Sequence, residues 1–103
     1  AWHEGMDFAG ANGSDVVAVA NGVVIFAGER SGYGKMIEIS HGSDLRTRYG
    51  HHQEVLVHAG QSVKRGDVIG LMGSSGRSTG PHVHFEVLKS GKPVNPAKYV
   101  SAR

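Results

Sequence analysis

Short runs of apolar residues, rich in valine and isoleucine and separated by glycine, dominate the hydrophobic pattern of this chain. The runs are too short for typical helices, and β-branched residues favour extended backbone. They predict strands at residues 16–20, 22–27, 35–39, 45–49, 55–57, 68–72 and 82–88. Many short strands with almost no helix predict an all-β fold, an antiparallel sandwich or barrel-like sheet.

Two local signals refine this pattern. Asn21-Gly22 separates the first two runs and predicts a hairpin, because this dipeptide favours the positive φ angles of a tight turn. Asn95–Tyr99 predicts a helical turn, with proline directly after a capping asparagine.

The length of 103 residues indicates a single domain over residues 1–103. No apolar run approaches the roughly 20 residues of a membrane helix, so we expect no membrane contact by this domain. The first residues lack the pattern of a signal peptide, so we expect any export segment to lie outside this sequence. Because candidate chemistry begins as early as His3, we expect the chain to be the C-terminal part of a longer exported precursor.

Charge and cysteine content exclude several functions. The net charge of +2 comes from scattered basic residues, and no nucleic-acid-binding motif accompanies them. The absence of cysteine excludes disulfides and thiolate zinc sites, and suits a compartment outside the cytoplasm.

The spacing of His82, His84 and Glu86 indicates a functional face. In a strand these three residues lie on one face, with Val83, Phe85 and Val87 on the other. Imidazoles on a half-buried face are costly unless a metal, a substrate or a hydrogen-bond network uses them. Two solvent-facing histidines remain the alternative.

A second cluster lies near the start of the chain, where His3 and Asp7 are four residues apart. The stretch imitates the H-E-x-x-H motif of helical zinc proteases, but Gly5 interrupts it and no helical periodicity supports it. We therefore interpret Glu4 as exposed. In irregular or extended backbone, His3 and Asp7 could bind one ion.

Together these clusters offer nitrogen and oxygen donors and no sulfur. Three protein ligands with one position left for water is the pattern of catalytic zinc. His51, after Tyr49-Gly50, ends a predicted strand and could reach such a site from the following loop. Spacing alone does not separate the role of His82 from that of His84.

The motifs, in order along nearly the whole chain, are H-x-G-x-D-F-A, V-x-A-x-x-x-G-V-V, G-Y-G, Y-x-H, G-x-x-V-x-x-G-x-x-I-G and S-S-G-R-S-T-G-P-H-V-H-F-E. In these motifs the sequence resembles the lysostaphin/LytM-type zinc endopeptidases. The resemblance implies a duplicated hybrid motif fold and a zinc ion held by His3, Asp7 and His84. It also implies that His51 and His82 are the catalytic histidines.

The same resemblance implies a substrate and a location. The family cuts the stem-peptide crosslinks of bacterial peptidoglycan, which lie outside the cytoplasm, in the periplasm or cell envelope. The sequence of residues 3–9 is more similar to that of Gram-negative envelope members of the family. This similarity favours D,D-endopeptidase activity on D-alanine to meso-diaminopimelate bonds over cleavage of glycine bridges. Serine- and glycine-rich rims at residues 31–34 and 74–80 would suit a narrow groove for small, unbranched peptides.

Departures from the family pattern are few. His52 replaces a residue that is usually apolar, so the surroundings of His51 could differ locally. We expect His41 and His58 at the surface or in turns, and Trp2 and Tyr33 to serve packing more than substrate binding. Glu86 could hold a histidine ring or bond to other neighbouring groups.

Other functions fit parts of the sequence. A wall-binding or amidase-activating module of the same fold would lack the ligands, whereas this chain has all of them. A phosphocarrier of the sugar-uptake type also uses paired histidines but needs no residue like Asp7. A biotin or lipoate carrier needs its lysine at the tip of a tight turn, and Lys35 lies within a predicted strand instead.

Overall fold

A computed structural model describes residues 5–74 and 80–98 and confirms the all-β prediction. Its elements are β1 (Gly5–Ala9), β2 (Asp15–Val17), β3 (Gly22–Arg30), β4 (Gly34–Ser40), β5 (Leu45–Val55), β6 (Ser62–Val63), β7 (Val68–Met72), β8 (His82–Lys89), β9 (Lys92–Val94) and the 3-10 turn η1 (Pro96–Lys98). The side chain of Asn95 accepts a hydrogen bond from the Ala97 amide, as the predicted helical turn requires. In the described part of the chain, no helix is long and apolar enough to cross a membrane.

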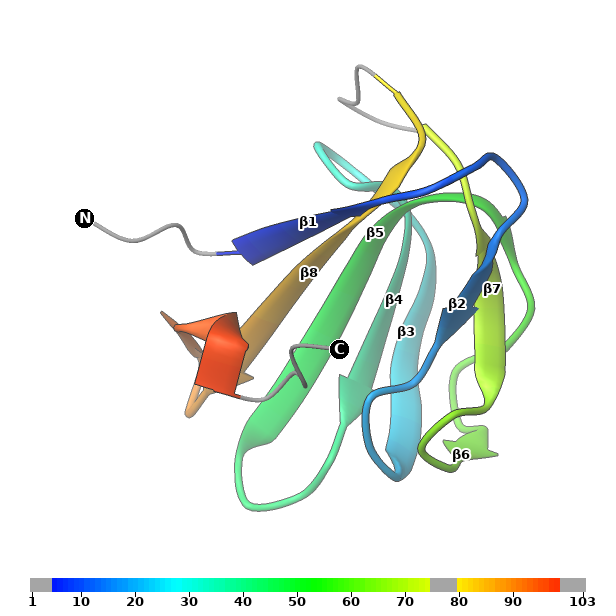
Figure 1. Cartoon of the computed structure of the whole chain (residues 1–103). Helices are drawn as coiled ribbons and strands as arrows, with labels where there is room; N and C mark the ends of the chain where they lie inside the picture. Colours follow the sequence, from blue (N-terminus) through cyan, green and yellow to red (C-terminus); the bar gives the residue numbers. More distant parts are fainter. Residues whose placement is uncertain (1–4, 75–79, 99–103) are drawn as a thin grey trace.

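The strands form one curled antiparallel sheet in the order β1-β8-β5-β4-β3-β6 (Figure 1). Strand β9 pairs with β8, and β2 joins the sheet through β7. The long strand β5 is central, because it pairs with β4 and β8 and, near its C-terminal end, with β7. The curl gives the sheet an inner face, which forms the core, and an outer face.

A β-bulge in β5 changes the direction of its side chains. Tyr49 pairs with Ile37 and His52 pairs with Lys35, so Gly50 and His51 together lie opposite Met36 alone. His51 has a φ of 66°, a left-handed conformation that is uncommon for residues other than glycine. Such bulges bend a strand and redirect a side chain, here the imidazole of His51.

The inner face of the sheet is apolar. Val83, Phe85 and Val87 of β8 point into the core, and His84 and Glu86 alternate with them on the outer face, as their spacing predicts. The core cluster contains Val16, Ala18, Val24, Ile37, Ile39, Tyr49, Val57, Val63, Ile69, Met72, Val83, Phe85 and Val87.

The hairpin predicted at Asn21-Gly22 is wrong. Strand β2 pairs with β7 and not with β3, and Gly22 is not among the residues with positive φ. A side chain at position 22 would collide with the carbonyl oxygen of Ser40 and the side chain of Ile39. Glycine is therefore required here for close packing of the backbone.

The separate strand predicted at residues 55–57 is also wrong. Val55 ends β5, whose continuation past the bulge pairs with β7 over His52 to Val55. Residues 56 and 57 follow it outside any strand. Because the bulge interrupts the alternation of buried and exposed positions, the sequence pattern divides this strand in two.

His41 lies in the β4–β5 turn, which fits the expectation for it, and its ring is also part of a hydrogen-bond chain that reaches the core. Its ring nitrogens contact the Asn21 carbonyl and the Thr47 hydroxyl, each at 2.7 Å. Thr47 in turn lies 2.9 Å from the hydroxyl of Tyr49, which accepts a hydrogen bond from the Val19 amide at 3.2 Å. Exposed His58 fits the turn position expected for it.

We expect the Tyr49→Phe substitution to lower the free energy of unfolding by about 1–3 kcal/mol, because it deprives the Val19 amide and Thr47 of a buried partner. Urea denaturation followed by circular dichroism measures this change. The Thr47→Val variant and the double variant complete the test. Strictly additive losses would show that the two hydroxyls contribute independently, contrary to a connected chain.

Candidate metal and catalytic centre

The candidate site lies on the outer face of the sheet, where three strands meet in register. Asp7 of β1 pairs with His84 of β8, which pairs on its other side with Gly50 of β5. A Cβ at position 50 would lie 3.2 Å from the Tyr33 ring, so the glycine makes room for this ring. Tyr33 comes from the β3–β4 turn, and its ring centroid is 6.2 Å from that of His84.

These residues line an open cleft of about 480 Å³. The lining consists of Asp7, Gly32, Tyr33, His51, His82, His84 and Glu86. The cleft therefore combines three imidazoles with two carboxylates, a donor set suited to both metal binding and proton transfer.

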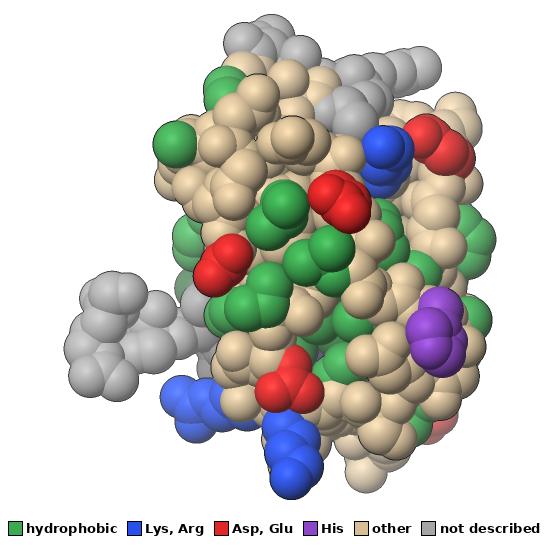
Figure 2. All heavy atoms as spheres, turned by 90° about the vertical axis from the view of Figure 1, so that its right-hand side faces the viewer, with side chains coloured by type: hydrophobic (Ala, Val, Ile, Leu, Met, Phe, Trp, Pro, Cys, Tyr) green, Lys and Arg blue, Asp and Glu red, His purple; other side chains and the backbone are tan. Residues whose placement is uncertain are grey.

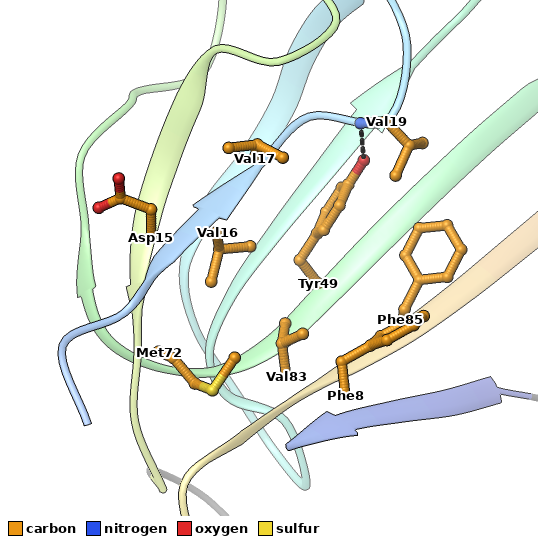
Figure 3. A pocket seen from close by; sticks show the side chains of 9 residues that line it. All are labelled: Phe8, Asp15, Val16, Val17, Val19, Tyr49, Met72, Val83 and Phe85. Carbon is orange, nitrogen blue, oxygen red and sulfur yellow. Dashed lines mark hydrogen bonds between the residues drawn. The ribbon is translucent and has the colours of Figure 1, made fainter. Parts of the chain in front are cut away.

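A second pocket, on the inner side of the sheet, differs in chemistry. Its volume is about 210 Å³, and its walls are apolar apart from the Tyr49 hydroxyl and Asp15, which lies at its margin away from Tyr49 (Figure 3). Figure 2 shows apolar side chains gathered on the nearby face over β2 and β7, where Val17 and Val68 are exposed. Among the described residues that line this pocket, Asp15 is the only carboxylate and no histidine is present, so the candidate chemistry belongs to the outer cleft.

His84 lies between two carboxylates. Its Nδ1 is 2.8 Å from Asp7 Oδ1 and its Nε2 is 2.9 Å from Glu86 Oε2. The hydrogen bond to Glu86, with the additional contribution of Asp7, raises the pKa of His84 to about 9 despite partial burial. Burial alone would raise the pKa of Glu86, but the hydrogen bonds from His84 and Tyr33 lower it overall. This position therefore strongly favours a positive charge.

His82 and His51 face each other beside this pair. Their ring centroids are 4.9 Å apart, and His82 Nε2 is 3.6 Å from Asp7 Oδ1. His82 Nδ1 lies 2.9 Å from the carbonyl oxygen of Gly80, to which it can only donate. In neutral His82 this bond places the lone pair on Nε2, the nitrogen that points toward Asp7.

Tyr33 has a polar role in the cleft, contrary to the expectation that it mainly serves packing. Its hydroxyl donates to Glu86 Oε1 at 2.8 Å, and Arg48 donates to the same hydroxyl at 3.4 Å. Burial, followed by the contact with Glu86, raises the pKa of Tyr33. The G-Y-G motif is the only sequence signal that points to this residue, and it does not show which partner the hydroxyl finds.

The structure brings together four of the five predicted site residues, Asp7, His51, His82 and His84. His3, like Trp2 and Glu4, lies outside the described residues. Within residues 5–74 and 80–98, no three histidine or acidic groups are arranged to hold a metal. The pair of Asp7 and His84 nevertheless fits a metal site, because Glu86 binds the far ring nitrogen of His84, as second carboxylates do for metal-bound histidines.

His52, next in the chain, is fully buried behind the bulge. Its Nδ1 lies 2.9 Å from the carbonyl oxygen of Lys35, and a side chain at position 70 would collide with its ring. Burial lowers the pKa of His52 below its ordinary value, with a further contribution from nearby His51. The His52 ring thus connects β5 to β4 through this hydrogen bond.

Because the pKa of His52 is lower in the folded state, the unfolded chain binds more protons below about pH 6.5, and folding should weaken as pH falls through that range. We expect the free energy of unfolding of the wild type, relative to that of His52→Leu, to decrease from pH 7.5 to pH 5. Urea denaturation of the metal-free proteins measures it. His58→Leu, which removes an exposed histidine, is the control, and a pH-independent difference for His52→Leu would contradict this prediction.

Comparisons with known proteins agree with this geometry. The model of Peptidase family M23 matches residues 1–96. The DD-carboxypeptidase/endopeptidase Mpg of Neisseria meningitidis is 45% identical over 94 residues, which are 91% of this chain and 22% of that protein. The murein hydrolase activator NlpD of Salmonella dublin is 42% identical over 102 residues, which are 98% of this chain and 27% of that protein.

Among solved structures, a zinc-containing peptidase from Vibrio cholerae superposes with a TM-score of 0.85 at 46% identity, covering 89% of this chain and 28% of that one. The chain thus spans 22% to 28% of the length of these three proteins. The family model covers nearly all of the sequence, and the curled sheet and colinear motifs agree with it. The chain therefore belongs to Peptidase family M23, the family of the lysostaphin/LytM-type peptidases.

Proposed function

We propose that this chain is a zinc-dependent endopeptidase that hydrolyses the peptide crosslinks of bacterial peptidoglycan in the cell envelope. The observation that carries the proposal is the 2.8 Å approach of Asp7 and His84 beside the facing imidazoles of His51 and His82. A metal-ligand pair next to two further imidazoles is an arrangement suited to hydrolysis and unnecessary for wall binding alone.

We assign the metal to His3, Asp7 and His84. The relative from Vibrio cholerae is a zinc-containing peptidase, which supports zinc as the metal. Zinc in such a site supplies a Lewis acid that polarises a carbonyl group and makes water more acidic. Glu86 would hold the His84 ring in the orientation that turns Nδ1 toward the metal.

We assign the proton transfers to the two remaining histidines. His82 would act as the base toward the attacking water through Nε2, which its bond to the Gly80 carbonyl leaves unprotonated in the neutral ring. His51 would stabilise the oxyanion or protonate the departing amine. The geometry also permits the exchange of these two roles.

The favoured bond is the D-alanine to meso-diaminopimelate crosslink. The Neisseria relative bears the name DD-carboxypeptidase/endopeptidase, which supports a D,D-bond over a glycine bridge. Digestion of walls with direct crosslinks and of walls with glycine bridges, followed by mass spectrometry of the fragments, tests this assignment. We expect crosslinked dimers of the first wall to become monomers and the glycine bridges of the second to stay intact.

An activator of another wall hydrolase is the second candidate, because the chain is also 42% identical to NlpD. Elemental analysis and the digestion distinguish the two functions. A zinc-loaded protein that leaves every wall intact but stimulates an added amidase would replace our proposal with the activator.

A further inference from the structure

We propose that Arg30, Arg46 and Arg48 form a carboxylate-binding subsite next to the cleft, so that preferred substrates carry a free carboxylate near the cleaved bond. This inference rests on the proposed peptidase function and specifies its substrate class. It starts from an imbalance of charge on the outer face of the sheet.

Three guanidinium groups converge there on one buried carboxylate. Glu38 of β4 has a side chain only 4% exposed. Arg48 lies 3.1 Å from it, Arg46 3.4 Å and Arg30 3.7 Å. A single carboxylate cannot neutralise three cations, so the cluster has excess positive charge.

The second carboxylate nearby does not remove this excess. Glu86 lies 3.7 Å from Arg48, but it also accepts hydrogen bonds from His84 and Tyr33. Asp44 shares a separate shallow hollow with Arg46, without an ion pair between them among the described residues. The excess charge therefore remains on the face that a substrate would approach.

Two of the three arginines are accessible to a ligand. The side chain of Arg46 is 53% exposed and that of Arg30 is 39% exposed, whereas Arg48 is mostly covered. Arg30 is also held in place, because its guanidinium lies 4.5 Å from the centroid of the Phe26 ring. Guanidinium groups bind carboxylates through paired, planar hydrogen bonds, so fixed and exposed arginines are suited to this ligand.

The cluster is continuous with the cleft. Arg48 donates to the Tyr33 hydroxyl, and its strand position pairs with Glu86, both of which line the cleft. Arg46 pairs with Leu88, four residues beyond His84 on β8. A strand advances about 3.3 Å per residue, so Arg48 and Arg46 lie about 7 and 13 Å along β5 from Gly50, the residue that pairs with His84. An extended peptide spans these distances in about two to four residues, which places the carboxylate that close to the scissile bond.

Steady-state kinetics on matched peptides test this subsite. Three versions of one crosslinked peptide are needed: all carboxylates free, the terminal carboxylate amidated, and the inner carboxylates amidated. We expect Arg30→Gln and Arg46→Gln each to raise KM for the free peptide by about 3- to 10-fold with kcat unchanged. KM for one of the amidated peptides should not respond to these substitutions, and that peptide identifies the bound carboxylate. Lys64→Gln, at an exposed cation of the β6–β7 turn, is the control.

Two outcomes separate this inference from the proposed function. Equal KM changes for all three peptides, or none, would overturn the subsite while the peptidase function stands. If the wild type cleaves none of the peptides, the proposed function fails, and fluorescence anisotropy of the same peptides bound to the zinc-loaded protein decides the subsite. The subsite is supported if the peptide with free carboxylates binds more tightly than an amidated peptide and Arg46→Gln removes this difference. Equal binding of all three peptides overturns the subsite.

Discussion

Replacement of Asp7 by alanine should remove zinc and hydrolytic activity together. Asp7 is the only carboxylate within hydrogen-bond distance of His84 Nδ1 in the described structure, and it would supply the oxygen donor of the assigned site. Loss of carboxylates that merely orient metal ligands typically costs about 10- to 100-fold in metal affinity, so loss of a ligand should cost more than about 100-fold. His84→Ala should have the same effect.

Elemental analysis after dialysis and a peptidoglycan-clearing assay measure the two losses. Asp15→Ala is the matched control, because Asp15 borders the apolar pocket on the other side of the sheet. Circular dichroism verifies that each variant folds. Full zinc content in folded Asp7→Ala would refute the assigned ligand set.

Substitution of His82 by alanine should have the opposite pattern, with zinc retained and turnover reduced by about 100-fold or more. His82 Nε2 is 3.6 Å from Asp7 Oδ1, whereas His84 Nδ1 is within hydrogen-bond distance of that atom. We therefore expect His82 to transfer protons beside the metal and not to bind it. His51→Ala should also keep zinc and lose turnover.

The measurements are zinc content and kcat on a crosslinked peptide over the pH range 5 to 9. A catalytic base determines one side of the plot of kcat against pH. His82→Ala should therefore flatten that side of the plot, whereas His58→Ala should leave it unchanged. A purified His82→Ala protein without zinc would show that His82 is a ligand and would reverse the division of roles.

Much of the site could be anticipated from β8. The alternation of residues 82 to 87 is strict, and a period of two places histidines and apolar residues on opposite faces without any long-range information. Spacing could not separate His82 from His84, because both lie on the same face. The distinction depends on Asp7 and on the Gly80 carbonyl, which contact different rings. From the sequence, only the family resemblance separates the two histidines, and their division of roles stays a prediction.

The features that sequence reasoning missed depend on contacts between distant segments. Gly22 carries a turn signal, but its position is determined by the neighbouring strand at Ser40. His41 appears polar and exposed in sequence, yet its hydrogen bonds connect to Thr47 and the turn at Asn21. Tyr33 finds Glu86, 53 positions away, through the pairing of β4, β5 and β8. Local propensity contains none of these pairings.

The bulge in β5 shifts the inward and outward alternation of its side chains by one residue. In a regular strand Tyr49 and His51 would lie on one face, but here Tyr49 enters the core and His51 lines the cleft. The number of residues between Tyr49 and His52 is therefore as important as their identities. Deleting Gly50 would remove the bulge and bring the His51 side chain to the position where the absence of a Cβ now leaves space for the Tyr33 ring, whereas many substitutions nearby would leave the spacing intact.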